Sequence, residues 1–197
     1  VLNANKFVNV VGATLDADRF NQANKAFSFS GMSNFIEYSS DVANLDQSNP
    51  QSISFWARSR NAPNVNMPTN YITKTNNYDM ASPSVGSSVN QFTLSTAAAN
   101  GEANTSLSYS NTGALWNHYV FVFKTGSNNT KIYRNDTLLA TGTLTYLADR
   151  TGNQLKFVVG KSSQIPSGEF SGWIDDIRVY GKALSDVEIG NLYAYES

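Results

Sequence analysis

Clusters of Asn, Ser, Gly and Pro divide this sequence into short apolar segments. Aromatic and β-branched residues recur in the segments and favour strands, whereas the clusters between them have the composition of turns. About ten or eleven short strands without intervening helices are therefore expected, which is typical of an all-β sandwich or jelly roll. The expected strands lie at 7–11, 26–29, 34–38, 53–58, 71–75, 91–95, 118–124, 131–134, 137–140, 155–160 and 172–180.

The segment 118–124 has the strongest strand signal. Tyr and Phe at its odd positions alternate with His and Val at its even positions. Both faces are then apolar, which predicts a central strand in a packed sandwich. Asn135 and Asp136 separate the next two segments and predict a tight hairpin, because both residue types tolerate positive φ.

Neutral polar residues are unusually abundant, since Asn, Ser and Thr make up 63 of 197 residues. Aromatic residues amount to 12% and occur along the whole chain, which indicates a packed core rather than disorder. A formal net charge of −1 lacks the basic excess that binding to nucleic acid or an anionic membrane requires. No apolar run is long enough for membrane insertion. Cysteine is absent and His118 is the single histidine, which excludes thiolate and histidine-rich zinc sites.

One helix is indicated near the C-terminus. Ser185 and Glu188 have the spacing of a capping box, and Leu184 can pack on Ile189 as a hydrophobic staple. The predicted helix covers residues 186 to about 193. It is short, and we expect it to cover one end of the sandwich.

Several motifs along the chain occur in an order that a known family shares. They are Asp-Arg-Phe at 18–20, Ala-Phe-Ser-Phe-Ser-Gly at 26–31, Ile-Ser-Phe-Trp at 53–56, Trp-Asn-His at 116–118, Ile-Tyr-Arg-Asn-Asp at 132–136 and Phe-Ser-Gly-Trp-Ile-Asp-Asp-Ile-Arg-Val-Tyr at 170–180. Together they resemble the bacterial laminin G-like branch of the concanavalin A-like lectin/glucanase domains. The resemblance implies a two-sheet antiparallel jelly roll with one short C-terminal helix. We expect residues 1–197 to form a single such domain, excised from a larger protein.

The resemblance also implies a function. Similar domains serve as carbohydrate-binding modules, adhesin domains and appendages of polysaccharide-degrading enzymes. We expect a non-catalytic, lectin-like module that binds a glycan or polysaccharide outside the cell or at its surface, with the other domains of the parent protein as partners. An adhesion or spacer domain that binds protein is the alternative. A glycoside hydrolase or lyase is disfavoured, because no Glu lies in a strand with paired acids and His118 matches a structural position.

A structural calcium ion is a further implication of the resemblance. The family often holds one between its N-terminal and C-terminal segments, and calcium prefers carboxylate and carbonyl oxygens. The matching positions are Asp18 and Asp176, with Asp16 and Asp175 in reserve. The alternative for these acids is an ion pair with Arg19 or Arg178.

The two adjacent acids constrain how such an ion could bind. In strict strand alternation, Asp175 shares a face with Ile177, and Asp176 shares the other face with Ile174. The two carboxylates can therefore bind one ion together only if the strand bends.

Candidate sugar-binding residues concentrate in and near the stretch 59–90, which is rich in Asn and Pro and predicts a long loop. An aromatic ring offers a sugar an apolar contact, while amides and carboxylates bind its hydroxyls. These residue types occur at Asn76, Asn77, Tyr78 and Asp79, and further platforms are Tyr71 and Tyr146. A plain polar turn is the alternative for 76–79.

Overall fold

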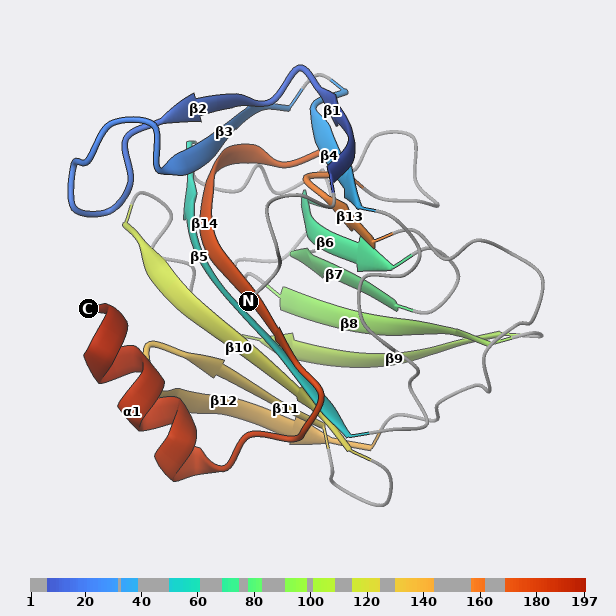
Figure 1. Cartoon of the computed structure of the whole chain (residues 1–197). Coiled ribbons are helices and arrows are strands. Elements are labelled where there is room, and N and C mark those ends of the chain that lie inside the picture. The colour runs from blue at the N-terminus through green and yellow to red at the C-terminus, as the bar shows by residue number, and fades with distance from the viewer. Residues whose placement is uncertain are drawn as a thin grey trace.

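The structure is a computed structural model that describes residues 7–31, 33–38, 50–60, 69–74, 78–82, 91–98, 101–108, 115–124, 130–143, 157–161 and 169–197. Fourteen strands in these ranges form two seven-stranded antiparallel sheets, as the jelly-roll expectation requires (Figure 1). The first sheet has the order β1 (Phe7–Val11), β4 (Phe35–Tyr38), β13 (Phe157–Val159), β6 (Thr69–Lys74), β7 (Tyr78–Ser82), β8 (Gln91–Ala98) and β9 (Gly101–Ser108). The second has the order β12 (Thr137–Gly142), β11 (Thr130–Arg134), β10 (Asn117–Phe123), β5 (Gln51–Ser59), β14 (Ser171–Tyr180), β3 (Ala26–Ser30) and β2 (Thr14–Asp16).

Aromatic side chains fill the space between the two sheets. Phe55 of β5 stacks on Phe121 of β10 with ring centroids 5.9 Å apart, and both are fully buried. Phe157 of the facing sheet meets Tyr38 edge-on at 5.7 Å. Such ring pairs contribute about 0.5–1.5 kcal/mol beyond the area that they bury.

Strand β10 confirms the prediction of a central strand with two apolar faces. It pairs with β5 on one side and β11 on the other, and every residue in it is buried. Its Tyr and Phe residues belong to the core between the sheets, whereas Val120 and Val122 belong to a second cluster with Leu184 and Ile189. The hairpin that follows also forms as predicted, with φ of 49° at Asn135 and 64° at Asp136.

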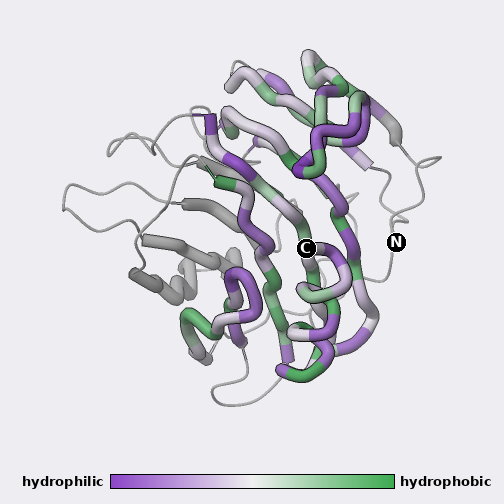
Figure 2. The backbone as a smooth tube through the Cα atoms, turned by 90° about the vertical axis from the view of Figure 1, so that its left-hand side faces the viewer, coloured by the Kyte–Doolittle hydropathy of each residue, from purple (hydrophilic) through white to green (hydrophobic). Residues whose placement is uncertain are grey.

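The C-terminal helix α1 (Asp186–Glu196) lies on the outer face of the second sheet, not at one end of the sandwich (Figures 1 and 2). It also extends beyond the expected end at residue 193. The physical reason for its position is the second apolar face of β10, which Ile189 of the helix and Leu184 just before it cover. Within the described ranges, no helix has the length and hydropathy to cross a membrane.

The stretch 59–90 is more regular than expected, because β6 and β7 lie within it. Three strands were missed altogether: β2, β7 and β9. β9 is built largely from small and polar residues, whose intrinsic strand preference is weak. β9 forms because it pairs with β8 over its whole length. A local sequence pattern does not reveal this pairing.

Candidate functional site

A β-bulge in β14 shapes the polar surface beneath α1. Between Asp175 and Arg178, two residues stand opposite a single residue of β5, and Asp176 has a φ of 47°. The extra residue reverses the alternation, so that Ile174 before the bulge and Ile177 after it both pack on the core. The expectation that Asp175 shares a face with Ile177 is therefore wrong.

The bend brings two candidate calcium ligands onto one arginine. Arg19 Nη1 lies 2.9 Å from Asp175 Oδ2 and 2.9 Å from Asp176 Oδ2. Its guanidinium also covers the ring of Trp56, with Cζ 4.6 Å from the ring centroid. The positive charge beside these two carboxylates is thus supplied by the chain itself.

The other two candidate ligands have separate roles. Asp16 accepts a hydrogen bond of 2.8 Å from Trp173 Nε1. Asp18 Oδ1 accepts from the backbone amides of Phe20 and Gln22 at 2.9 and 2.8 Å, which caps a turn. In the part of the chain that the structure describes, no three His, Cys, Asp or Glu side chains are placed to hold a metal. The four acids are therefore not gathered into one metal site, and calcium stays a prediction.

Glu196, in the last turn of α1, anchors the helix to the sheet. Its side chain is 1% exposed and forms an ion pair with Arg178. Trp56 Nε1 donates to Glu196 Oε2 at 2.8 Å, and Arg19 Nε donates to the Glu196 backbone oxygen at 2.9 Å. Burial raises the pKa of the Glu196 carboxyl, while the indole and the arginines oppose this rise.

His118 lies beside this anchor and is fully buried. Its ring stacks on Trp56 at 5.2 Å, and Tyr193 of α1 stacks on the same indole at 5.8 Å. Although Nε2 is 3.5 Å from Glu196 Oε2, that carboxylate is already bound by other donors. Burial, together with the charges of two nearby arginines, lowers the pKa of His118 to about 4, so the imidazole is neutral.

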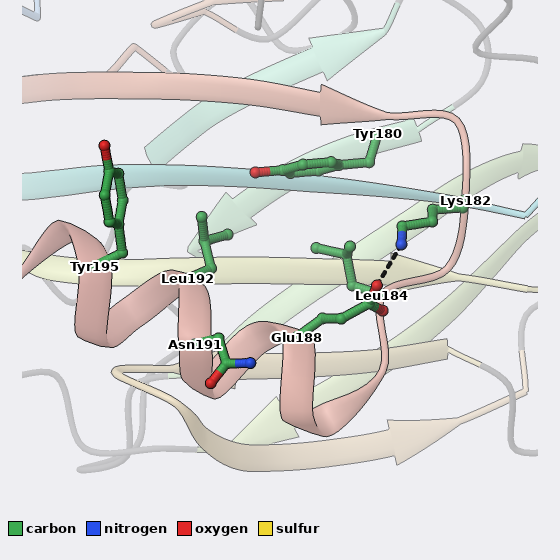
Figure 3. Close-up of a pocket in the computed structure, with 7 residues that line it drawn as sticks. All are labelled: Tyr180, Lys182, Leu184, Glu188, Asn191, Leu192 and Tyr195. Atoms are coloured by element: carbon green, nitrogen blue, oxygen red, sulfur yellow. Dashed lines mark hydrogen bonds and ion pairs between the residues drawn. The ribbon is translucent and has the colours of Figure 1, made fainter.

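A groove of about 360 Å³ runs between α1 and the end of β14 (Figure 3). The ring of Tyr180 lies across its top, and Tyr195 stands upright at one end, to the left of Leu192 in this view. At the opposite end, Lys182 forms an ion pair with Glu188. The remaining lining residues are Leu184 and Asn191.

Local contacts hold the helix start that borders this groove. The predicted capping box is present, because Glu188 N donates to Ser185 Oγ and Glu188 Oε2 accepts from Ser185 N. Ser52 Oγ of β5 connects the preceding turn by accepting from Leu184 N at 2.9 Å and donating to Lys182 O at 3.0 Å. The groove is therefore bordered by a rigid helix start and a rigid strand end.

The sugar-binding residues predicted from sequence lie elsewhere. Tyr71 is in β6, while Tyr78 and Asp79 begin β7, where they pair with Lys74 and Thr73. The side chains of Tyr71, Tyr78 and Asp79 lie outside the part of the chain that the structure describes. Asn76, Asn77 and Tyr146 lie outside the described residues. The platform hypothesis for these positions stays a prediction.

Sequence reasoning missed the groove, although a signal for it exists. Glu188, Asn191, Leu192 and Tyr195 follow one another at spacings of three, one and three residues. In a helix, such spacing places side chains on one side. What the spacing does not reveal is that Tyr180 of another element lies across from them.

Solved structures with a similar fold include domains that bind sugar or protein. Domain 4 of AbnA, a GH43 extracellular arabinanase from Geobacillus stearothermophilus, was solved in complex with arabinotriose. It is 21% identical with a TM-score of 0.62, and the match covers 94% of this chain and 90% of that domain.

Two botulinum neurotoxin structures are also similar. One concerns type C, whose cell entry depends on interaction with two ganglioside molecules. It is 16% identical with a TM-score of 0.68, and the match covers 95% of this chain and 46% of that chain. The other is the DC binding domain in complex with rat synaptotagmin II, at 18% identity, a TM-score of 0.69 and coverage of 94% and 46%. This chain thus spans about half the length of the neurotoxin domains, and identities this low show the fold alone.

Comparison with the curated proteins finds no match. The family model described as the concanavalin A-like lectin/glucanases superfamily matches residues 30–190, most of the chain. The match includes the central strands β5 and β10 of the second sheet and the bulged strand β14. The chain belongs to the concanavalin A-like lectin/glucanases superfamily.

Proposed function

We propose that this chain is a non-catalytic carbohydrate-binding module. The observation that carries the proposal is its likeness to the arabinanase domain solved with arabinotriose, which extends over nearly the full length of both chains. A fold by itself hosts many functions. Here, however, the similar structures are binding domains, which supports a binding module.

The chemistry of the buried acids supports a role without catalysis. Glycoside hydrolysis needs two carboxyl groups that face one substrate, one of them free to give up a proton. In the described ranges, the most buried carboxylates are those of Glu196 and Asp175, and arginines bind both. Glu196 holds α1 to the sheet through Arg178 and Trp56, and Asp175 binds Arg19.

The parent protein is proposed to act outside the cell or at its surface, because the similar arabinanase is extracellular. A protein-binding adhesion domain is the second candidate. It is supported by the neurotoxin binding domain of the same fold that was solved with rat synaptotagmin II.

A glycan and polysaccharide array, probed with the whole chain, tests the proposal. We expect binding to one defined sugar class, and we expect no hydrolysis of the bound polysaccharide in a reducing-sugar assay. Tyr78→Ala, tested on the same array, examines the 76–79 hypothesis. A folded sample that binds no glycan would contradict the proposal and favour the adhesion candidate.

A further inference from the structure

The groove between α1 and β14 has the chemistry of a site for a neutral sugar. Two tyrosine rings border it, from different elements, so that a sugar ring could contact an aromatic face at the top or at the end. Tyr195 is 84% exposed, which is unusual for so large an aromatic side chain. No core packing accounts for its position.

Hydrogen-bonding groups of both kinds also line the groove. The Asn191 amide can donate and accept, the Glu188 carboxylate accepts, and the Lys182 ammonium donates. The bonds to Lys182 and the capping residues lower the pKa of Glu188 to about 2, so the carboxylate remains an acceptor at any physiological pH. Because Lys182 and Glu188 neutralise each other, the groove favours an uncharged ligand with hydroxyl groups over an anion or a cation.

The size and stiffness of the groove suit a small ligand. Its volume of about 360 Å³ lies near the lower end of the usual range for ligand sites, about 300–1,000 Å³. The capping box, the Ser52 bridge and the buried Glu196 hold α1 in place before any ligand arrives. A preformed site loses little conformational entropy on binding.

We infer that this groove binds one or two neutral sugar residues of a glycan, with Tyr195 as the stacking platform and Asn191 as a hydroxyl partner. The inference rests on the proposed carbohydrate-binding function and assigns it a place. That place is the helix side of the second sheet, distinct from Tyr71, Tyr78 and Asp79, which are in strands of the first sheet.

The test is an NMR titration of the ¹⁵N-labelled chain with the neutral oligosaccharides arabinotriose, xylotriose, cellotriose and maltotriose, each at millimolar concentration. We expect at least one of them to shift the side-chain amide of Asn191 and the backbone amide of Tyr195. Tyr195→Ala is expected to weaken the binding of that oligosaccharide by about tenfold or more. Tyr195→Phe keeps the aromatic ring, so its affinity for the oligosaccharide should fall less than that of Tyr195→Ala.

Val187→Ala is the matched control, because Val187 is 72% exposed on the same helix and does not line the groove. It should bind as the wild type does, and circular dichroism should show that all variants are folded. If an oligosaccharide binds with unchanged affinity to Tyr195→Ala and shifts other residues, the groove assignment is wrong and the carbohydrate-binding function stands. If none of the four binds the wild type, the groove assignment is overturned, and the glycan array decides the proposed function separately.

Discussion

Glu196 carries the strongest tertiary constraint of any single residue in α1. A negative charge at a helix C-terminus is unfavourable, because it faces the negative end of the helix dipole. Arg178 compensates for this with a buried ion pair, and Trp56 adds a hydrogen bond of 2.8 Å. The residue is acidic because of its partners in β14 and β5, not because of the helix that contains it.

Glu196→Gln should destabilise the fold. The amide oxygen can still accept from Trp56, but Arg178 loses the charge of its buried partner, and breaking a buried ion pair typically costs about 3–5 kcal/mol. We expect the free energy of unfolding to fall by about 3 kcal/mol, measured by urea denaturation with tryptophan fluorescence. Glu188→Gln is the control, since this residue is on the exposed side of the helix and Gln preserves the capping box. Similar losses in both variants would contradict the assigned role of Glu196.

At the level of the element, the bulge decides which face each residue of β14 occupies. Ile174 and Ile177 are three positions apart, which in a regular strand would send them to opposite faces. The insertion of one residue returns both to the core and leaves two neighbouring carboxylates for Arg19. Positive φ at Asp176 is tolerated because Asp is among the residues that visit this region.

Deleting single residues from the bulge tests this account. Deletion of Asp176 should restore regular alternation with both isoleucines still in the core, and remove only one partner of Arg19. Deletion of Ile177 should instead place Asp176 at a core position, where a buried unpaired carboxylate is costly. This variant should unfold, or lose several times more stability than the Asp176 deletion does. Urea denaturation and circular dichroism of both variants measure the difference. Equal stability of the two would show that the bulge does not control the faces.

At the level of the whole molecule, α1 forms a third layer over the two sheets, and titratable groups are buried where it meets the second sheet (Figure 1). His118 has its pKa lowered to about 4 by burial, whereas burial and the charge of Asp176 raise the pKa of Asp175 to about 6. The two groups have opposite effects on the pH dependence of stability. In the folded state His118 resists protonation, whereas Asp175 is protonated more readily than in the unfolded chain.

The pH dependence of stability follows from these shifts. As the pH falls from the ordinary histidine value of 6.5 to about 4, the unfolded chain takes up a proton that folded His118 refuses, so stability is lost. Asp175 has the opposite sign and adds stability as the pH falls from about 6 to 3.8. His118→Phe removes the histidine contribution. Between pH 7 and pH 4, the free energy of unfolding of this variant should therefore rise by roughly 3 kcal/mol relative to that of the wild type.

Urea denaturation of both proteins at several pH values between 4 and 7 measures that difference. The packing of Phe in place of His sets the difference in stability between the two proteins at neutral pH. It does not affect how that difference changes with pH. A constant difference between the two proteins across the range would show that His118 is not the group responsible.

Metal removal tests the calcium prediction for the whole domain. Because Arg19 already pairs with Asp175 and Asp176, we expect the melting temperature to stay within about 1 °C when EDTA replaces millimolar calcium. Differential scanning calorimetry measures it, with magnesium as the control for ionic strength. An increase of several degrees in calcium alone would establish a structural ion and require donors beyond those described.

Much of the architecture could be predicted from sequence, because it depends on local chemistry. Alternating aromatic residues in β10, the Asn135-Asp136 turn and the Ser185–Glu188 capping box each act over a few residues, and each is present in the structure. The family motifs extend this local evidence to the whole jelly roll, which the family model confirms over residues 30–190.

The tertiary structure alone decided the faces and the partners. Arg19 meets Asp175 across 156 positions of sequence, and Trp56 meets Glu196 across 140, distances at which no local pattern carries information. The bulge in β14, the position of α1 on the sheet and the groove beneath Tyr180 likewise depend on which surfaces pack together. The sequence by itself determined most strands, the Asn135-Asp136 turn and the helix cap, since these are set by short-range sterics and hydrogen bonds. Packing between remote segments determined where charges are buried and where a ligand can enter.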